Sequence, residues 1–134
     1  MKRRTLLATA LAATLPLGAT QAADDVVIGG ALSLSGPFAA YGEDNKAGMD
    51  MAVEAVNAKG GVLGRKLRIQ YDDSAGDRAK AVAIYRKYGA DPSIVADLFV
   101  SSVEFVALDP VANEVKLPMI AIGSVIPYKD FSPW

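Results

Sequence analysis

The 134-residue chain contains no cysteine and no histidine. Without cysteine it forms no disulfide and offers no thiol nucleophile, so packing alone has to hold the fold. Without histidine it lacks the usual general base, and without both it lacks the side chains of most zinc sites. These absences argue against an enzyme, and nothing in the composition indicates a metal or another cofactor.

The apolar segment near the N-terminus, residues 5–17, is too short and too rich in alanine and threonine to span a bilayer. It follows the basic residues 2–4 and precedes the small-residue sequence ATQA, which ends at Ala22. This order is typical of a secretory signal peptide. We therefore expect residues 1–22 to be a signal peptide and the rest of the chain to be exported. The paired arginines leave both the general secretory and the twin-arginine routes open.

Basic residues are too few to indicate a nucleic-acid-binding protein. The whole chain has 14 basic and 15 acidic residues. Residues 1–22 hold three of the basic ones and no acid, so the remainder has 11 basic and 15 acidic residues and a formal net charge of −4. A negative net charge disfavours nucleic acid and anionic membrane surfaces as partners. The length of 134 residues allows one domain at most, and the content of 51% apolar and 22% charged residues is that of a globular chain.

Apolar runs alternate with amphipathic segments after the signal peptide. Strands are predicted at residues 26–34, 65–73, 93–100 and 117–123, and helices at about 41–59, 77–89 and 101–116. This alternation predicts an α/β fold, a parallel sheet with right-handed crossovers and helices on both faces. Ligands bind beyond the carboxyl ends of such strands. The loops at those ends begin at Ser33, Asp72, Val100 and Gly123.

Several residues predict how the helices begin, end and face the core. Asp77 is a candidate N-cap of the second helix, and Pro110 either kinks the third helix or restarts it after a cap at Asp109. Small and apolar residues at helical spacing predict the buried face of the first helix. These residues are Gly48, Ala52, Ala55 and Val56.

Three motifs resemble catalytic or phosphate-binding sites, but the direction of their side chains, a missing residue or the order of elements excludes such a site. Asp72 and Asp73 are adjacent on an extended chain, so their side chains point to opposite sides and predict a solvated strand end. Ser124 stands in IGSVI, which lacks the second glycine of a nucleophile elbow. The glycines at 60, 61 and 64 follow a helix and precede a strand, the reverse of the order in a dinucleotide-binding loop.

Ser101 and Ser102 stand where the third strand ends and the third helix begins. A serine there ordinarily caps the helix. Two hydroxyls beside the N–H groups of a helix start also suit an anion such as a carboxylate. Tyr41 has two readings as well, a core aromatic or a wall against an apolar ligand. From local sequence, both residues of the pair and Tyr41 remain candidates for either role.

The segment IGGALSLSGPFAAYGEDNKAGMDMAVEAVNAKGGVLGRKLRIQYDDSAGD resembles the opening of the branched-chain amino-acid (Leu/Ile/Val-type) periplasmic binding proteins of ABC transporters. The SGP…YG loop, the NAKGGVLGRKL turn and the YDD…GD loop occur in the family's order. Further on, VSSVEFVALDPVANEVKLPMIAIGS is similar to the family's third loop, helix and fourth strand. The resemblance implies a periplasmic binding protein of type I that captures an amino acid or a similar small solute.

The resemblance also implies which residues contact the ligand. In that family a serine and its backbone N–H at the start of the third helix hold the α-carboxylate, and this serine corresponds to Ser102, with Ser101 beside it. The first-loop aromatic corresponds to Tyr41. A second contact comes from the loop after the fourth strand, which here contains Gly123, Ser124 and Val125. The family often has threonine at the position of Val125, so Ser124 is the candidate for that hydroxyl contact.

The same family has two lobes that close over the ligand and present it to an ABC permease in the inner membrane. Residues 23–134 are therefore expected to form an incomplete N-terminal lobe. One departure is ADLFV, where Asp97 and Leu98 replace residues of an apolar strand that usually ends in glycine. Two other functions stay open: a ligand-sensing domain of a receptor or regulator with the same fold, and a fragment of an exported α/β hydrolase.

Overall fold

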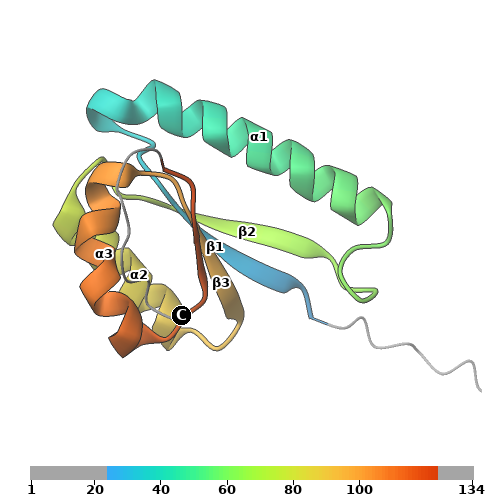
Figure 1. Ribbon diagram of the computed structural model, residues 1–134. Coiled ribbons are helices and arrows are strands. Elements are labelled where there is room, and N and C mark those ends of the chain that lie inside the picture. The colour runs from blue at the N-terminus through green and yellow to red at the C-terminus, as the bar shows by residue number, and fades with distance from the viewer. Residues whose placement is uncertain (1–23, 124–134) are drawn as a thin grey trace, which may run out of the picture.

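A computed structural model of the chain describes residues 24–123 (Figure 1). The signal peptide predicted at residues 1–22 lies outside the described residues. The elements follow the predicted alternation, with a short 3-10 turn, η1, added after the first strand. Their order is β1 (Val26–Leu32), η1 (Gly36–Phe38), α1 (Ala39–Ala58), β2 (Leu67–Asp73), α2 (Arg78–Ala90), β3 (Ile94–Phe99), α3 (Ser102–Val115) and β4 (Met119–Ala121).

The four strands form one parallel sheet in the order β2-β1-β3-β4. Helix α1 lies on one face of the sheet, and α2 and α3 lie together on the other (Figure 1). The predicted α/β class, with a parallel sheet and helices on both faces, is therefore confirmed. From β1 the chain goes to β2 on one side of β1, and then crosses back to β3 on the other side of β1. The strand order therefore reverses between β1 and β3.

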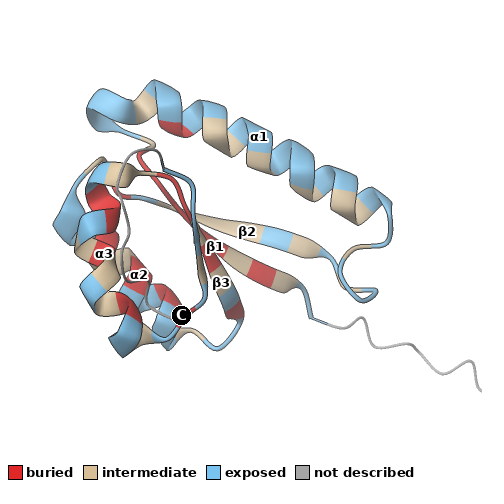
Figure 2. Ribbon diagram, viewed as in Figure 1, coloured by how far each residue is buried: buried red, intermediate tan, exposed pale blue. Residues whose placement is uncertain are grey.

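The core lies between the sheet and the α2–α3 pair (Figure 2). Tyr85 and Tyr88 of α2 are fully buried there, and each hydroxyl donates to a backbone carbonyl, that of Leu117 at 2.6 Å and that of Gln70 at 3.0 Å. Asp77 caps α2 as predicted, since its Oδ1 accepts from the Lys80 N–H at 2.8 Å. This face therefore combines apolar burial with satisfied hydroxyls.

Helix α3 runs unbroken across Pro110. The predicted alternative of a restart after an Asp109 cap is wrong. Proline removes one intrahelical hydrogen bond, but Leu108 and Ala112 on either side of it are buried against the core. Their packing holds the helix continuous, because tertiary contacts supply most of the stability of a helix in a protein.

Helix α1 is far more exposed than the other two helices, and only Gly42 within it is buried (Figure 2). The face predicted from small and apolar residues is wrong for Gly48 and Ala55, which are exposed, and nothing lies within 4 Å of a Cβ built on Gly48. Its other two members, Ala52 and Val56, line a cavity between the helix and the sheet, together with Met49 and Val53. The larger side chains contribute to this face because they bury more apolar area than glycine.

Candidate functional site

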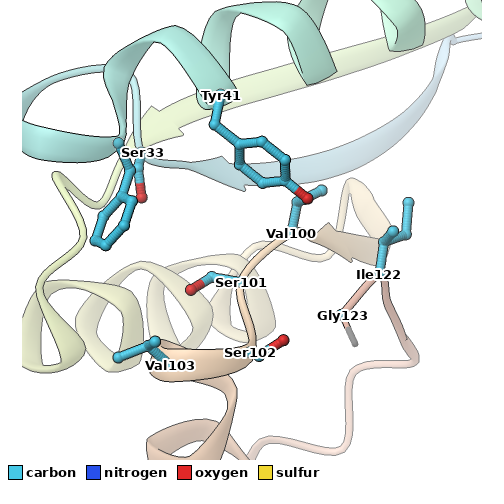
Figure 3. A pocket seen from close by; sticks show the side chains of 9 residues that line it. Ser33, Tyr41, Val100, Ser101, Ser102, Val103, Ile122 and Gly123 are labelled. Atoms are coloured by element: carbon cyan, nitrogen blue, oxygen red, sulfur yellow. The ribbon is translucent and has the colours of Figure 1, made fainter. Parts of the chain in front are cut away.

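A pocket of about 190 Å³ opens at the carboxyl ends of β1, β3 and β4 (Figure 3). Its position lies at the reversal of strand order between β1 and β3, where parallel α/β sheets bind ligands. Among the described residues the lining holds hydroxyl and apolar groups and no charged side chain. The lining residues are Ser33, Phe38, Tyr41, Val100, Ser101, Ser102, Val103, Ile122 and Gly123.

The start of α3 separates the roles of the two serines. Ser101 is the N-cap, and its Oγ accepts from the Glu104 N–H at 3.3 Å. Ser102 is the first helical residue, and its side chain lies against Gly123, where an added Cβ would stand 2.7 Å from the Ser102 Oγ (Figure 3). The structure thus supports both roles considered for the two serines. Ser101 caps the helix, and the Ser102 side chain lies at the wall of the pocket.

The first loop lies against α1 without a side chain between them. Gly42 is buried under this loop, and a Cβ added to it would stand 2.0 Å from the Ser33 carbonyl oxygen. Only glycine permits this approach of helix and backbone. Gly42 thereby brings the start of α1, and Tyr41 with it, to the edge of the pocket.

Asp73 holds the first loop to the loop that follows β2. Its Oδ1 accepts from the backbone N–H groups of Leu34, Ser35 and Ala75 at 2.8, 3.1 and 2.8 Å, and its Oδ2 accepts from the Ser35 Oγ at 2.5 Å. The Ser35 hydroxyl, helped by these N–H groups, lowers the pKa of Asp73 below its ordinary value. Asp73 is an exposed residue at the end of β2, as predicted, and its carboxylate in addition shapes the loop.

Asp72 has a different partner, as the opposite direction of its side chain requires. It forms an ion pair with Lys87 of α2, with Nζ–Oδ1 at 2.8 Å. Burial alone would raise the pKa of this carboxyl, but Lys87, together with the side chains of Tyr88 and Gln70, keeps it below its ordinary value. The adjacent carboxylates therefore do not form an acid–base pair.

Aromatic side chains stand at the mouth of the pocket. Tyr41 is 56% exposed and Phe38 is 49% exposed, so neither is a core residue. The Tyr41 ring projects from α1 across the opening toward Val100 and Ile122 (Figure 3). Of the two readings of Tyr41, the structure supports a wall of the pocket.

A buried hydrogen-bond chain lies below the pocket. The Ser33 hydroxyl, only 5% exposed, stands 3.4 Å from the Ser74 Oγ and donates to the Glu104 Oε2 at 3.5 Å. Ser74 and Glu104 are 0% and 1% exposed. The chain joins the ends of β1 and β2 to the first turn of α3, because its three members come from these three segments.

Four of the six residues predicted to contact a ligand line this one pocket: Ser101, Ser102, Tyr41 and Gly123. The other two, Ser124 and Val125, lie outside the described residues. The prediction named none of the other lining side chains, Ser33, Phe38, Val100, Val103 and Ile122, as ligand contacts. Their shared signal in the sequence is position, because each lies within a few residues of a predicted strand end.

Asp97 is the other buried acid, and it lies outside the pocket. It sits in β3 at 0% exposure, and neither carboxylate oxygen accepts a hydrogen bond of normal geometry. An added Cβ on Gly29 would stand 3.1 Å from the Asp97 Oδ1 and 2.5 Å from the Tyr88 ring, which places Asp97 on the α2 side of the sheet. Burial raises the pKa of the Asp97 carboxyl to about 7, and the Ala31 N–H opposes this only weakly.

Within residues 24–123 no group of acidic side chains is arranged to hold a metal ion. No helix in that part of the chain is long and apolar enough to cross a membrane.

The family described as periplasmic binding protein matches the chain over residues 25–134. The chain is a member of this family. Among the curated relatives, the Leu/Ile/Val-binding protein homolog 2 of Brucella abortus is 34% identical over 128 residues, which are 95% of this chain and 34% of the relative. The chain thus spans about a third of the length of the curated relatives it matches. Membership confirms the predicted resemblance and favours a solute-binding protein over an enzyme, including the α/β hydrolase alternative.

Solved structures of periplasmic binding proteins confirm the fold. A putative branched-chain amino acid ABC transporter protein from Rhodospirillum rubrum aligns with a TM-score of 0.67 and 32% identity, over 72% of this chain and 28% of that one. A fatty acid ABC transporter substrate-binding protein from Thermomonospora curvata aligns with a TM-score of 0.66 and 27% identity, over 73% of this chain and 25% of that one. Neighbours of nearly equal similarity therefore carry the names of different ligands.

Proposed function

We propose that the chain is the solute-binding component of an ABC importer and captures a branched-chain amino acid or a similar small solute. The observation that carries this proposal is the pocket itself. It combines hydroxyls and the N–H groups of the α3 start with apolar walls from Tyr41, Val100 and Ile122. A helix start attracts a carboxylate, and the apolar walls suit an aliphatic side chain.

Each candidate residue then has a role. Ser102 donates its hydroxyl and its N–H to the ligand carboxylate, and Ser101 orients this turn as the N-cap. Gly123 begins the loop that supplies further backbone donors, with Ser124 and Val125 completing it. Tyr41 packs against the aliphatic part of the ligand. The fit of Gly123 against Ser102 supports this grouping, because it brings two strand-end loops together.

A second lobe that closes over the ligand completes the site in this proposal. Val103 and Ile122 are each about half exposed, as are Phe38 and Tyr41, so one side of the pocket is open to solvent. A charge-assisted hydrogen bond contributes roughly 1.5–3 kcal/mol, whereas association costs about 4–15 kcal/mol. Two or three such bonds from one wall leave little net affinity. Residues 23–134 alone therefore bind weakly or not at all.

Export by residues 1–22 brings the protein to the periplasm, where it delivers its ligand to a permease in the inner membrane. The periplasmic family and the order of basic, apolar and small residues support this location. Fractionation of cells that express the chain with and without residues 1–22 tests it. Recovery of both forms from the cytoplasm would contradict export.

Calorimetry with L-leucine, L-isoleucine and L-valine tests the binding function on the intact protein, with whatever sequence its gene encodes beyond Trp134. Ser102→Ala should weaken binding by about 1–3 kcal/mol, because a hydrogen bond to a charged group is lost. Ser93→Ala is the matched control, since the Ser93 hydroxyl donates to Asp91 and Ser93 is not among the residues that line the pocket. Unchanged affinity in Ser102→Ala would reduce Ser102 to a structural role.

A simple carboxylate is a second candidate ligand. No charged side chain lines the pocket among the described residues, so no acid in the lining faces a ligand ammonium group. One structural neighbour is named for fatty acids. Comparing L-leucine with 4-methylpentanoate, which has the same carbon skeleton without the ammonium group, separates the two ligand classes.

A further inference from the structure

Glu104 is a buried carboxylate directly behind the pocket wall. It is 1% exposed, its Oε1 accepts no hydrogen bond from the described residues, and it forms no ion pair within residues 24–123. Burying a carboxylate without a counter-charge is costly. Among the described residues its side-chain partner is the Ser33 Oγ, which lies in the lining of the pocket. The feature that needs explaining is therefore a buried carboxyl group held by a residue of the pocket wall.

Glu104 fixes the direction of the Ser33 hydroxyl. The Ser33 hydroxyl donates to the Glu104 Oε2 at 3.5 Å, and a serine hydroxyl has a single hydrogen to donate. The Ser33 oxygen therefore has no hydrogen left for the pocket, although it can still accept one; the Ser74 Oγ stands 3.4 Å away. Because Ser33 lines the pocket, it offers an acceptor to a ligand.

The opposite polarity exists across the pocket at the start of α3. Backbone N–H groups of a helix start are donors and carry partial positive charge. Ser101 and Ser102 lie there, whereas Ser33 lies at the end of β1. The two poles come from different strand-end loops, so a ligand that bridges them has an acceptor at one end and a donor at the other.

We propose that Glu104 is a positioning residue that holds Ser33 as an acceptor for the ligand ammonium group, so that the site selects α-amino acids over the corresponding simple carboxylates. This inference rests on the proposed function. It adds a recognition element for the ammonium group, which no charged side chain supplies among the described residues of the lining.

The test compares L-leucine with 4-methylpentanoate on the intact protein by calorimetry. Glu104→Gln keeps the size of the side chain, but its amide can donate to Ser33 and release the Ser33 hydrogen toward the pocket. Ser33→Ala removes the acceptor itself. We expect either change to weaken leucine binding by about 10- to 100-fold, the range of a hydrogen bond to a charged group, and to leave 4-methylpentanoate within about twofold.

Glu114→Gln is the matched control, because it makes the same chemical change on the same helix at an exposed residue paired with Arg86. Thermal unfolding of each variant separates loss of fold from loss of selectivity, and Ser33→Ala keeps the proposal testable if Glu104→Gln does not fold. An unchanged leucine preference in both pocket variants, or an equal loss for both ligands, overturns the role of Glu104. Equal affinity of the unaltered protein for the two ligands also overturns it but leaves carboxylate binding in place. Failure to bind either ligand removes the proposed function itself.

Discussion

The two faces of the sheet are held by different means. On the α2–α3 face, large side chains such as Tyr85, Tyr88 and Phe99 are completely buried. On the α1 face, the helix leaves an apolar cavity of about 110 Å³ over the sheet. This cavity is lined by Ile28, Met49, Ala52, Val53, Val56, Leu67, Ile69 and Leu98.

Helix α1 is held by polar and backbone contacts at its two ends, and in its middle by the Tyr71 hydroxyl, which donates to the Asp50 Oδ1 at 2.8 Å. At the pocket end Gly42 touches the backbone of Ser33. At the other end the Asn57 side chain pairs with the backbone of Leu67, accepting from its N–H at 2.7 Å and donating to its carbonyl at 2.9 Å. The comparison teaches that one face supplies stability, while the other positions the first loop of the pocket.

The largest expected effect comes from truncating the packed face. Phe99→Ala should lower the free energy of unfolding by about 3–5 kcal/mol, because it leaves a cavity in a fully buried site. Val53→Ala, on the α1 face, should cost much less, because Val53 is only half-buried and already borders a cavity. Urea unfolding of both variants measures the difference. Equal losses would show that the two faces are packed alike.

Asp97→Asn sharpens the comparison, because it removes a buried charge from the packed face. The native pKa of about 7 exceeds the ordinary value of 3.8. Below the ordinary pKa both the folded and the unfolded state hold the proton, and the carboxyl carries no penalty. As pH rises from about 4 to about 7 the unfolded state releases the proton first, so the native protein loses stability.

Asp97→Asn should therefore be more stable than the unaltered protein at pH 8, by on the order of a few kcal/mol, and nearly equal to it at pH 4. Urea unfolding at the two pH values makes the measurement. Asp44→Asn, at an exposed position on α1, is the control for the change of charge alone. A gain of the same size at both pH values would contradict an ionising Asp97.

Adding one methyl group at either of two glycines of α1 tests how closely that helix contacts the rest of the chain. Gly42→Ala should destabilise by about 1–3 kcal/mol, as overpacking does, because the methyl group meets the Ser33 carbonyl. Gly48→Ala should stabilise by about 0.5–1 kcal/mol, because the position is open and alanine is the better helix former. Thermal unfolding of the two variants measures these changes in stability. Two stabilising results would mean that α1 is not fixed at the pocket end.

Sequence predicted what depends on local signals. The strand–helix alternation, the Asp77 cap and the serine pair at the start of α3 all follow from residues a few positions apart. The sheet-facing side of α1 followed only in part: Ala52 and Val56 border the sheet as predicted, but Met49 and Val53 were missed, because the prediction relied on small residues that carry little apolar signal. Continuity across Pro110 depends on buried neighbours in the core, which no local pattern reveals.

The candidate site also has residues that local signals predicted and contacts that they did not. Tyr41, Ser102 and Gly123 were predictable because they lie at strand ends or in the resembling motifs. The contact between Ser33 and Glu104 was not, because it joins residues 71 positions apart and only the folded sheet brings them together. The same holds for Asp73, whose four donors lie on two loops.

The Asp73 carboxylate has a consequence for how tightly a ligand can be held. By fixing Leu34, Ser35 and Ala75 in the folded chain, it leaves the first loop preorganised before any solute arrives. Ordering a loop on binding would subtract from the affinity. Here that entropy is lost during folding instead, so more of the interaction energy remains for recognition and closure.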